Sequence, residues 1–118
     1  MPAGAPDGRC GGRTGEQSEG TTVSTRGIER KLRKVAQALR KARAELAVVT
    51  EQLPYLDDDA ADLATRAVVS DDRSFVPEAR RAREHADALR VERDRLRSKI
   101  ARLEADQDRL LDQLSGSL

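Results

Sequence analysis

The amino-acid sequence predicts an all-α protein with two long helices in a coiled-coil hairpin, a short connecting helix and a disordered N-terminal tail. Three observations predict this fold class. Of the 118 residues, 36% are charged and only 2% are aromatic, whereas aromatic side chains usually supply much of the buried area of a compact core. Apolar residues recur at alternating intervals of three and four, which is the repeat of a coiled-coil seam. Residues 1–25 contain six of the eight glycines and two of the four prolines.

Residues 1–25 form the predicted tail. Val23 is its only branched aliphatic residue, so the segment cannot bury enough apolar surface to offset the entropy of ordering it. The patterned part of the chain begins near Val23, and a valine codon often serves as a start in GC-rich bacterial genes. We therefore expect residues 1–22 to be an upstream extension that is not translated in the cell. Cys10 is the only cysteine, which excludes an intramolecular disulfide.

The first long helix is expected over residues 28–53. Its seam consists of eight residues spaced by fours and threes: Ile28, Leu32, Val35, Leu39, Ala42, Leu46, Val49 and Leu53. Four further apolar residues broaden the stripe and indicate more than one neighbour: Ala36, Ala38, Ala47 and Val48. Pro54 is expected to end this helix, because its ring clashes with the preceding turn and disfavours a helical residue before it.

A short helix is expected over residues 58–69. Three consecutive aspartates, Asp57 to Asp59, precede an Ala/Leu/Val-rich run, and aspartates favour a helix N-terminus because they accept hydrogen bonds from its first amides. Capping explains this cluster better than a metal site, since the stretch lacks the glycine bend of a calcium loop. The two aromatic residues, Tyr55 and Phe75, flank the short helix and are expected to pack together at a hinge.

The second long helix is expected over residues 77–114, after a loop from Ser70 to Val76. Pro77 fits the first turn of a helix, and Gly116 is expected to stop it, with residues 115–118 as the chain end. Leucine recurs every seven residues at Leu89, Leu96, Leu103 and Leu110. The other seam column contains Ala86, Arg93, Ile100, Gln107 and Leu114. Residues 26–114 thus form one helical domain.

Two assemblies of these helices remain open at this point. In one, the second long helix folds back on the first as an antiparallel hairpin, which places a strongly basic segment beside an acidic chain end. In the other, it pairs in parallel with its copy from another chain, and Arg93 and Gln107 on the seam fix the register. We expect a homodimer, since hairpins could also dimerise through the overhanging helix. The expected interface residues are Leu32, Leu39, Leu46, Leu53, Leu89, Leu96, Ile100, Leu103 and Leu110.

Charge is unevenly distributed along the chain. Residues 26–43 contain eight basic residues and one acidic residue, whereas residues 51–72 contain seven acidic residues and one basic residue. Six basic side chains lie off the seam and are candidates for phosphate contacts with nucleic acid: Arg30, Arg33, Lys34, Arg40, Lys41 and Arg43. No aromatic residue interleaves with them to stack on bases, so a solvated face is the competing interpretation.

The sequence provides no constellation for catalysis. His85 is the only histidine, and neither a Gly-rich phosphate loop nor an activated serine or cysteine arrangement is present. We therefore expect no enzymatic activity, no metal and no cofactor. No window has the roughly 20 apolar residues of a membrane span, and no apolar signal core is present at the N-terminus. The expected location is the cytoplasm.

Residues 28–114 resemble a family of small Ala/Arg-rich actinobacterial proteins without an assigned activity. The matching segments are Ile28–Leu32, Ala67–Ser70, Ala82–Ala88 and Ile100–Leu114. The resemblance implies no catalytic residue and supports a protein without the tail. Separately, Ala82–Asp87 resembles the tip segment of the transcript-cleavage factors, which bind RNA polymerase. However, the heptad repeat runs through these residues, which would place Asp87 in the middle of a helix.

The sequence therefore favours a non-enzymatic coiled-coil scaffold or adaptor. Its expected partners are a second copy of itself and an unidentified protein, with no membrane association. An accessory protein that binds nucleic acid through the basic face is the alternative, and an RNA polymerase-binding hairpin is the less favoured third interpretation.

Overall fold

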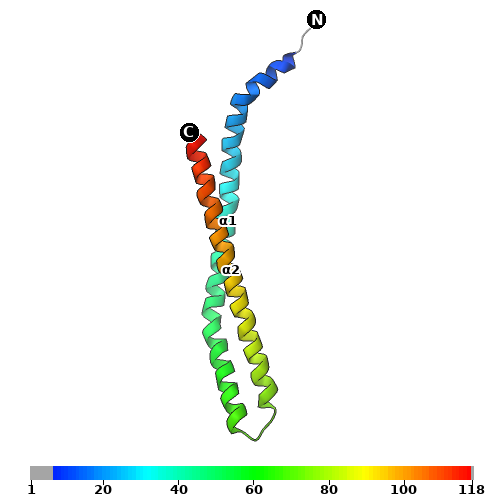
Figure 1. The fold of residues 1–118 in the computed structure, drawn as a ribbon, viewed down its shortest axis with the longest axis vertical. Helices are drawn as coiled ribbons and strands as arrows, with labels where there is room; N and C mark the ends of the chain where they lie inside the picture. Colours follow the sequence, from blue (N-terminus) through cyan, green and yellow to red (C-terminus); the bar gives the residue numbers. More distant parts are fainter. Residues whose placement is uncertain (1–6, 118) are drawn as a thin grey trace. The chain divides into compact units, whose positions relative to one another are not determined.

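The computed structural model describes the backbone of residues 7–117 and the side chains of residues 25–116. Two helices, α1 (Asp7–Val69) and α2 (Phe75–Ser117), make up this part of the chain, which contains no strand (Figure 1). The prediction of an all-α protein with two long helices is confirmed. Except for Thr25, the expected tail lies outside the described side chains, and residues 1–6 lie outside the described backbone as well. The helix α1 begins at Asp7, so the expected start of the first long helix at residue 28 is wrong.

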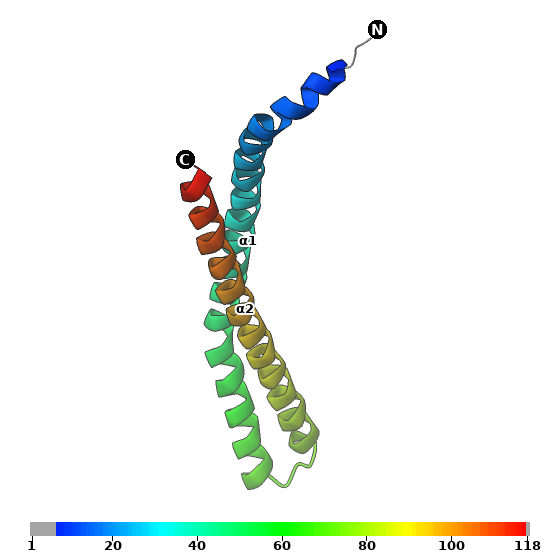
Figure 2. The same ribbon diagram turned by 45° about the horizontal axis from the view of Figure 1, so that its top comes forward.

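The chain divides into two compact units. Unit 1 comprises Met1–Gln37 with Glu104–Leu118, and unit 2 comprises Ala38–Leu103. Unit 2 is a helical hairpin, in which the second half of α1 and the first part of α2 run antiparallel on either side of their connecting loop (Figures 1 and 2).

The core of unit 2 is a narrow seam between the two helices. Ala42 and Val49 from α1 and Leu96 from α2 form its buried centre, and Leu46, Leu89 and Ile100 pack against it. Leu96 and Ala42 are completely buried, with 0% of their surface exposed. The ladders of both helices therefore face each other within one chain, as the antiparallel assembly requires.

The expected helix break at Pro54 is wrong. Pro54 lies inside α1, and the short helix expected at residues 58–69 is the last part of that same helix. A proline in a helix interior costs about 3 kcal/mol, but the apolar ladder continues past it in phase. The continuing seam residues are Leu53, Leu56, Ala60, Leu63 and Ala67.

Burial along the continuing ladder explains why the helix persists. Leu53 is 7% exposed and Ala60 only 2%, and these two residues lie on either side of Pro54. A break at Pro54 would turn one of these two stretches away from α2. Packing against α2 therefore outweighs the local preference of the proline, as tertiary contacts commonly do with helix propensity.

Two further expectations depended on the break and are also wrong. Asp57, Asp58 and Asp59 lie in the middle of α1 and do not cap a helix start. Tyr55 does not pack on Phe75, because α1 continues for 14 residues beyond Tyr55, a rise of about 21 Å. Tyr55 is 72% exposed.

The loop between the helices is shorter than expected and spans residues 70–74. The N–H of Ser70 donates to the carbonyl of Arg66 (2.9 Å), which closes the last turn of α1. Within the loop, the N–H of Asp72 donates to Ser70 Oγ (3.0 Å) and the N–H of Ser74 donates to Asp72 Oδ1 (2.9 Å). The bond from the backbone of Ser74 lowers the pKa of the Asp72 carboxyl.

The second helix extends beyond its expected bounds at both ends. It begins at Phe75, so Pro77 lies in its first turn as expected, and it continues through Gly116 to Ser117. The expectation that Gly116 stops the helix is wrong: no described glycine adopts positive φ, the conformation that commonly follows a helix C-terminus.

Candidate interaction surfaces

The predicted interface residues are used inside the chain. Leu39, Leu53, Leu96 and Leu110 are buried, and the other five are half-buried: Leu32, Leu46, Leu89, Ile100 and Leu103. In unit 2, Leu46, Leu89 and Ile100 pack against the core formed by both helices. The four buried leucines are covered within the chain, whereas the five half-buried residues keep part of their surface exposed.

Interactions between charged residues of α1 and α2 support the antiparallel pairing in unit 2. Arg90 of α2 forms ion pairs with Asp57 of α1 and with Asp87 of its own helix, the latter at 2.7 Å. Arg95 makes two hydrogen bonds to the Glu92 carboxylate (3.1 and 2.7 Å). The pKa of Arg95 is raised, mainly by Glu92 and to a smaller extent by Glu45 of α1.

A parallel pairing of α2 with its copy would place Glu92 of one chain beside Arg97 of the other. Hydrogen bonding from Arg95 lowers the pKa of Glu92, and Arg97 lies 3.9 Å from Asp94 on its own helix. Glu92 and Arg97, which would pair between chains in a parallel coil, therefore each have a partner within α2.

The surface of α1 that faces away from the seam is largely apolar in unit 2. We define the outer face of α1 as the positions opposite the seam over residues 44–69. They are Ala44, Ala47, Val48, Glu51, Pro54, Tyr55, Asp58, Ala61, Asp62, Thr65, Val68 and Val69. All twelve are exposed, and eight are apolar. Val48 is 52% exposed, Val68 83% and Val69 76%.

The corresponding surface of α2 differs in chemistry but not in exposure. We define the outer face of α2 as the positions opposite its seam over residues 80–102. They are Arg80, Arg81, Glu84, Asp87, Ala88, Val91, Asp94, Arg95, Ser98, Ala101 and Arg102. All are exposed, and seven are charged. The outer face of α2 is thus an ordinary solvated surface, whereas that of α1 leaves several large apolar side chains in water.

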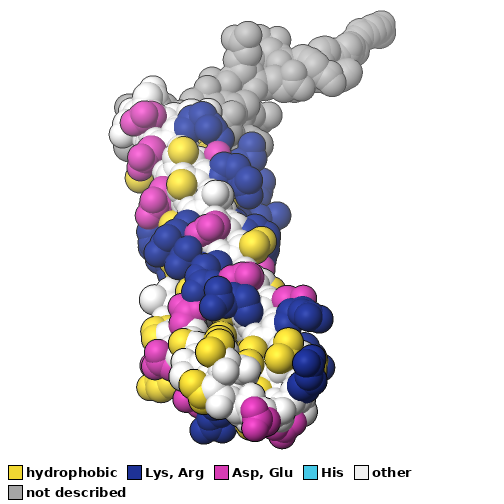
Figure 3. All heavy atoms as spheres, turned by 60° about the horizontal axis from the view of Figure 1, so that its bottom comes forward, with side chains coloured by type: hydrophobic (Ala, Val, Ile, Leu, Met, Phe, Trp, Pro, Cys, Tyr) yellow, Lys and Arg dark blue, Asp and Glu magenta, His cyan; other side chains and the backbone are white. Residues whose placement is uncertain are grey.

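The loop end of unit 2 continues the apolar surface of α1. Val68 and Val69 lie there with Val76 of α2, which is 46% exposed. A shallow hollow of about 340 Å³ is lined by Ala67, Ser70, Asp71, Asp72, Arg73 and Val76. Viewed from this end, hydrophobic side chains are visible among charged ones (Figure 3).

The six candidate phosphate-binding residues are all exposed, three in each unit. Among the described residues, no ion pair joins Arg30, Arg33, Lys34, Arg40 or Lys41 to a carboxylate, whereas Arg43 interacts with a partner. Within the described part of the chain, the five residues other than Arg43 are therefore available for phosphate contacts.

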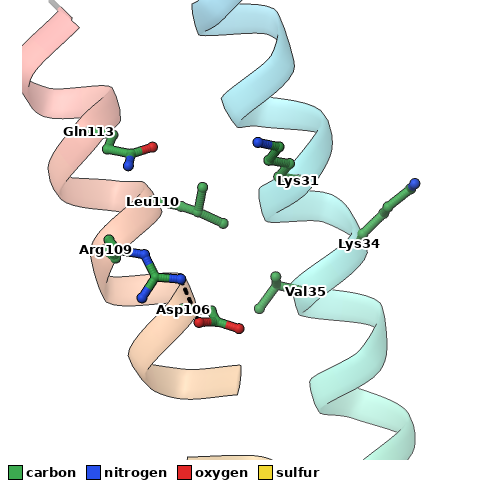
Figure 4. A pocket seen from close by; sticks show the side chains of 7 residues that line it. All are labelled: Lys31, Lys34, Val35, Asp106, Arg109, Leu110 and Gln113. Atoms are coloured by element: carbon green, nitrogen blue, oxygen red, sulfur yellow. Dashed lines mark hydrogen bonds and ion pairs between the residues drawn. The ribbon is translucent and has the colours of Figure 1, made fainter. Parts of the chain in front are cut away.

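In unit 1, a shallow hollow of about 360 Å³ lies between the two helices (Figure 4). Val35 and Leu110 point into it from opposite sides, and Lys34 extends outward. Arg109 pairs with Asp106 at 2.6 Å on the α2 side. The basic segment of α1 therefore lies beside the acidic end of α2 here, as the hairpin assembly predicts.

The described residues show no arrangement suited to catalysis or metal binding. No polar or charged side chain is buried among them, and no three histidine, cysteine or acidic residues are grouped to hold a metal ion. His85 is exposed and lines a hollow of about 260 Å³ with Gln52, Tyr55 and Leu56. Cys10 lies outside the described side chains.

Ala82–Asp87, the segment that resembles a polymerase-binding tip, lies within α2 and not in the loop at residues 70–74. The structure therefore contradicts the placement that this interpretation needs. Neither helix, over the residues described, has a stretch that is both long and apolar enough to cross a membrane.

Sequence reasoning found the seams but not the outer face of α1 as a whole. Ala47 and Val48 were expected to contact an additional neighbour, and both are exposed in the structure. The same surface also contains Pro54, Tyr55, Val68 and Val69. Because a helix break was expected at Pro54, the residues before and after it were assigned to separate helices and not to one face. Comparison with models of protein families, with curated proteins and with solved structures gave no match.

Proposed function

We propose that this protein is a non-enzymatic, cytoplasmic scaffold or adaptor that binds other proteins by helix association. The single observation that carries the proposal is the outer face of α1, which exposes Val48, Tyr55, Val68 and Val69 to between 52% and 83%. Removing apolar surface of this kind from water favours association by roughly 25 cal/mol for each Å² buried.

The contrast with α2 supports this proposal. A helix that only forms a hairpin needs apolar residues on one face and polar residues on the opposite face. The outer face of α2 follows that rule, whereas the outer face of α1 does not. The additional apolar stripe therefore indicates a second neighbour for α1.

Capture experiments in extract from the native host test the proposal. We expect the full chain to retain specific proteins, and the double variant Val48→Glu/Tyr55→Glu to lose them. Val91→Glu is the matched control, because Val91 is a 68% exposed valine on the opposite helix. Equal capture by all three proteins would overturn the outer face of α1 as the binding surface.

Binding to nucleic acid is the second candidate, and one observation favours it. Five of the six candidate phosphate-binding residues have no acidic partner among the described residues. If phosphate contacts drive binding, the affinity for duplex DNA or RNA should fall steeply between low and moderate salt. Arg33→Ala/Lys34→Ala should weaken binding and reduce the salt dependence. Absence of retention on heparin at low salt would eliminate this candidate.

A further inference from the structure

We propose that the outer face of α1 in unit 2 docks antiparallel on the same face of a second copy of this chain. This inference rests on the proposed function and specifies the first partner. Its basis is the order in which charged and apolar side chains follow one another along this face and the turn before it.

From residue 40 to residue 62 this surface is basic at the start, mostly apolar in the middle, where Glu51 is the one charged member, and acidic at the end; Val68 and Val69 lie beyond the acidic end. Arg40 and Lys41 lie one turn before it and point the same way along the heptad; both are exposed. Ala44, Ala47, Val48 and Tyr55 supply most of the middle, and Asp58 and Asp62 follow. If a second copy lies antiparallel on this surface, the basic end of each copy faces the acidic end of the other.

A two-fold axis between residues 49 and 50 pairs basic with acidic residues and places Glu51 of each copy opposite Val48 of the other. It places Lys41 of each copy opposite Asp58 of the other, and Tyr55 opposite Ala44. The large tyrosine ring then meets an alanine, which permits close approach of the helices. A parallel arrangement would instead place Lys41 against Lys41 and Asp58 against Asp58.

Other features of the chain are compatible with this self-association. Its formal net charge is only +1, so long-range repulsion between copies is small. Two-fold dimers in which both copies use the same patch are the commonest assemblies of soluble proteins. The hairpin stays closed in this dimer, because the seam leucines are not required for the contact between copies.

Sedimentation equilibrium of the full chain tests the proposal, with Cys10→Ser as the background that prevents disulfide-linked dimers. We expect a concentration-dependent mass that approaches twice the 13.0 kDa of one chain. Val48→Glu should abolish the dimer, and the matched control Val91→Glu should not. Circular dichroism of each variant checks that the helices remain.

Charge reversal tests the orientation. Lys41→Glu should raise the dissociation constant about tenfold, because it converts two symmetric attractive contacts into repulsive ones. Asp58→Lys should do the same, and the double variant Lys41→Glu/Asp58→Lys should restore the dissociation constant to within about threefold of its original value. Tighter association of Lys41→Glu would overturn the antiparallel orientation, and failure of the double variant to recover would overturn the pairing of these two residues.

Two outcomes would overturn the dimer itself: a monomer at every concentration, or a dimer that Val48→Glu does not affect. Failure of this inference is distinguishable from failure of the proposed function. A monomer that still captures other proteins through Val48 and Tyr55 retains the proposed function with a different partner. A dimer that captures nothing retains the inference alone.

Discussion

The two sides of α1 in unit 2 carry similar apolar side chains in different surroundings. Val49 is 8% exposed on the seam, whereas its neighbour Val48 is 52% exposed on the outer face. Leu53 and Tyr55 show the same contrast two residues apart, at 7% and 72%. The comparison teaches that the phase of a residue relative to the ladder, and not its hydrophobicity, decides whether it stabilises the hairpin or remains available to a partner.

The largest expected change in stability comes from truncating a side chain on the seam, and truncation of a side chain on the outer face is the comparison. Leu53→Ala should lower the free energy of unfolding by about 2–4 kcal/mol, because it removes buried methyl groups and leaves a cavity. Tyr55→Ala should change it by less than about 0.5 kcal/mol in the monomer, since the side chain is exposed. Urea denaturation followed by circular dichroism, at low protein concentration, measures both values. Equal losses would show that the two sides do not differ in the way described.

Replacing the proline on the outer face should stabilise the hairpin. Pro54→Ala should raise the free energy of unfolding by about 1–3 kcal/mol, because it supplies the missing N–H for the carbonyl of Thr50 and removes the ring clash. Gln52→Ala is a control at a neighbouring exposed position and should have little effect. A loss of stability in Pro54→Ala would contradict a helix that continues through this residue.

Charged residues at the edge of the seam should contribute less to the free energy of unfolding than the buried residues at its centre. The ion pair between Asp57 and Arg90 should contribute about 0.2–1 kcal/mol in a double-mutant cycle, because both side chains are partly exposed to solvent. The cycle uses Asp57→Ala, Arg90→Ala and the double variant. Its coupling energy should shrink as salt is raised. A coupling energy of zero at low salt would show that the charges do not help to select the antiparallel pairing.

The smallest expected effect on stability is the pH dependence that arises from Asp72, in the loop that follows α1. The Ser74 backbone holds the pKa of the folded Asp72 carboxyl below the usual value of 3.8. The contribution of Asp72 to stability is therefore present above pH 3.8 and disappears as the pH falls through the lower folded-state value.

An NMR titration of the Asp72 carboxyl measures this shift directly, and its midpoint should lie below 3.8. Ser74→Ala removes the side-chain hydrogen bond but keeps the backbone donor, so it should bring the midpoint only part of the way back. A midpoint at or above 3.8 in the original chain would mean that Asp72 does not accept these hydrogen bonds.

The sequence alone determined the helical class, both ladders and the position of the turn. These features follow from local spacing, because a repeat of three and four residues places its members on one side of a helix whatever surrounds it. Leu89, Leu96, Leu103 and Leu110 were assigned to the seam of their helix on that basis, and all four are buried or half-buried. The loop was located to within two residues.

Tertiary structure decided the rest. Pro54 and the aspartates after it indicate a helix boundary when read locally, yet the seam of α2 keeps α1 intact past them, since burying Leu53 and Ala60 together requires one continuous helix. The choice between a hairpin and a parallel dimer also lay beyond the sequence, because one ladder can pair with several partners of the same spacing. The tertiary structure shows that α2 packs against the seam of α1 and that the opposite side of α1 remains exposed.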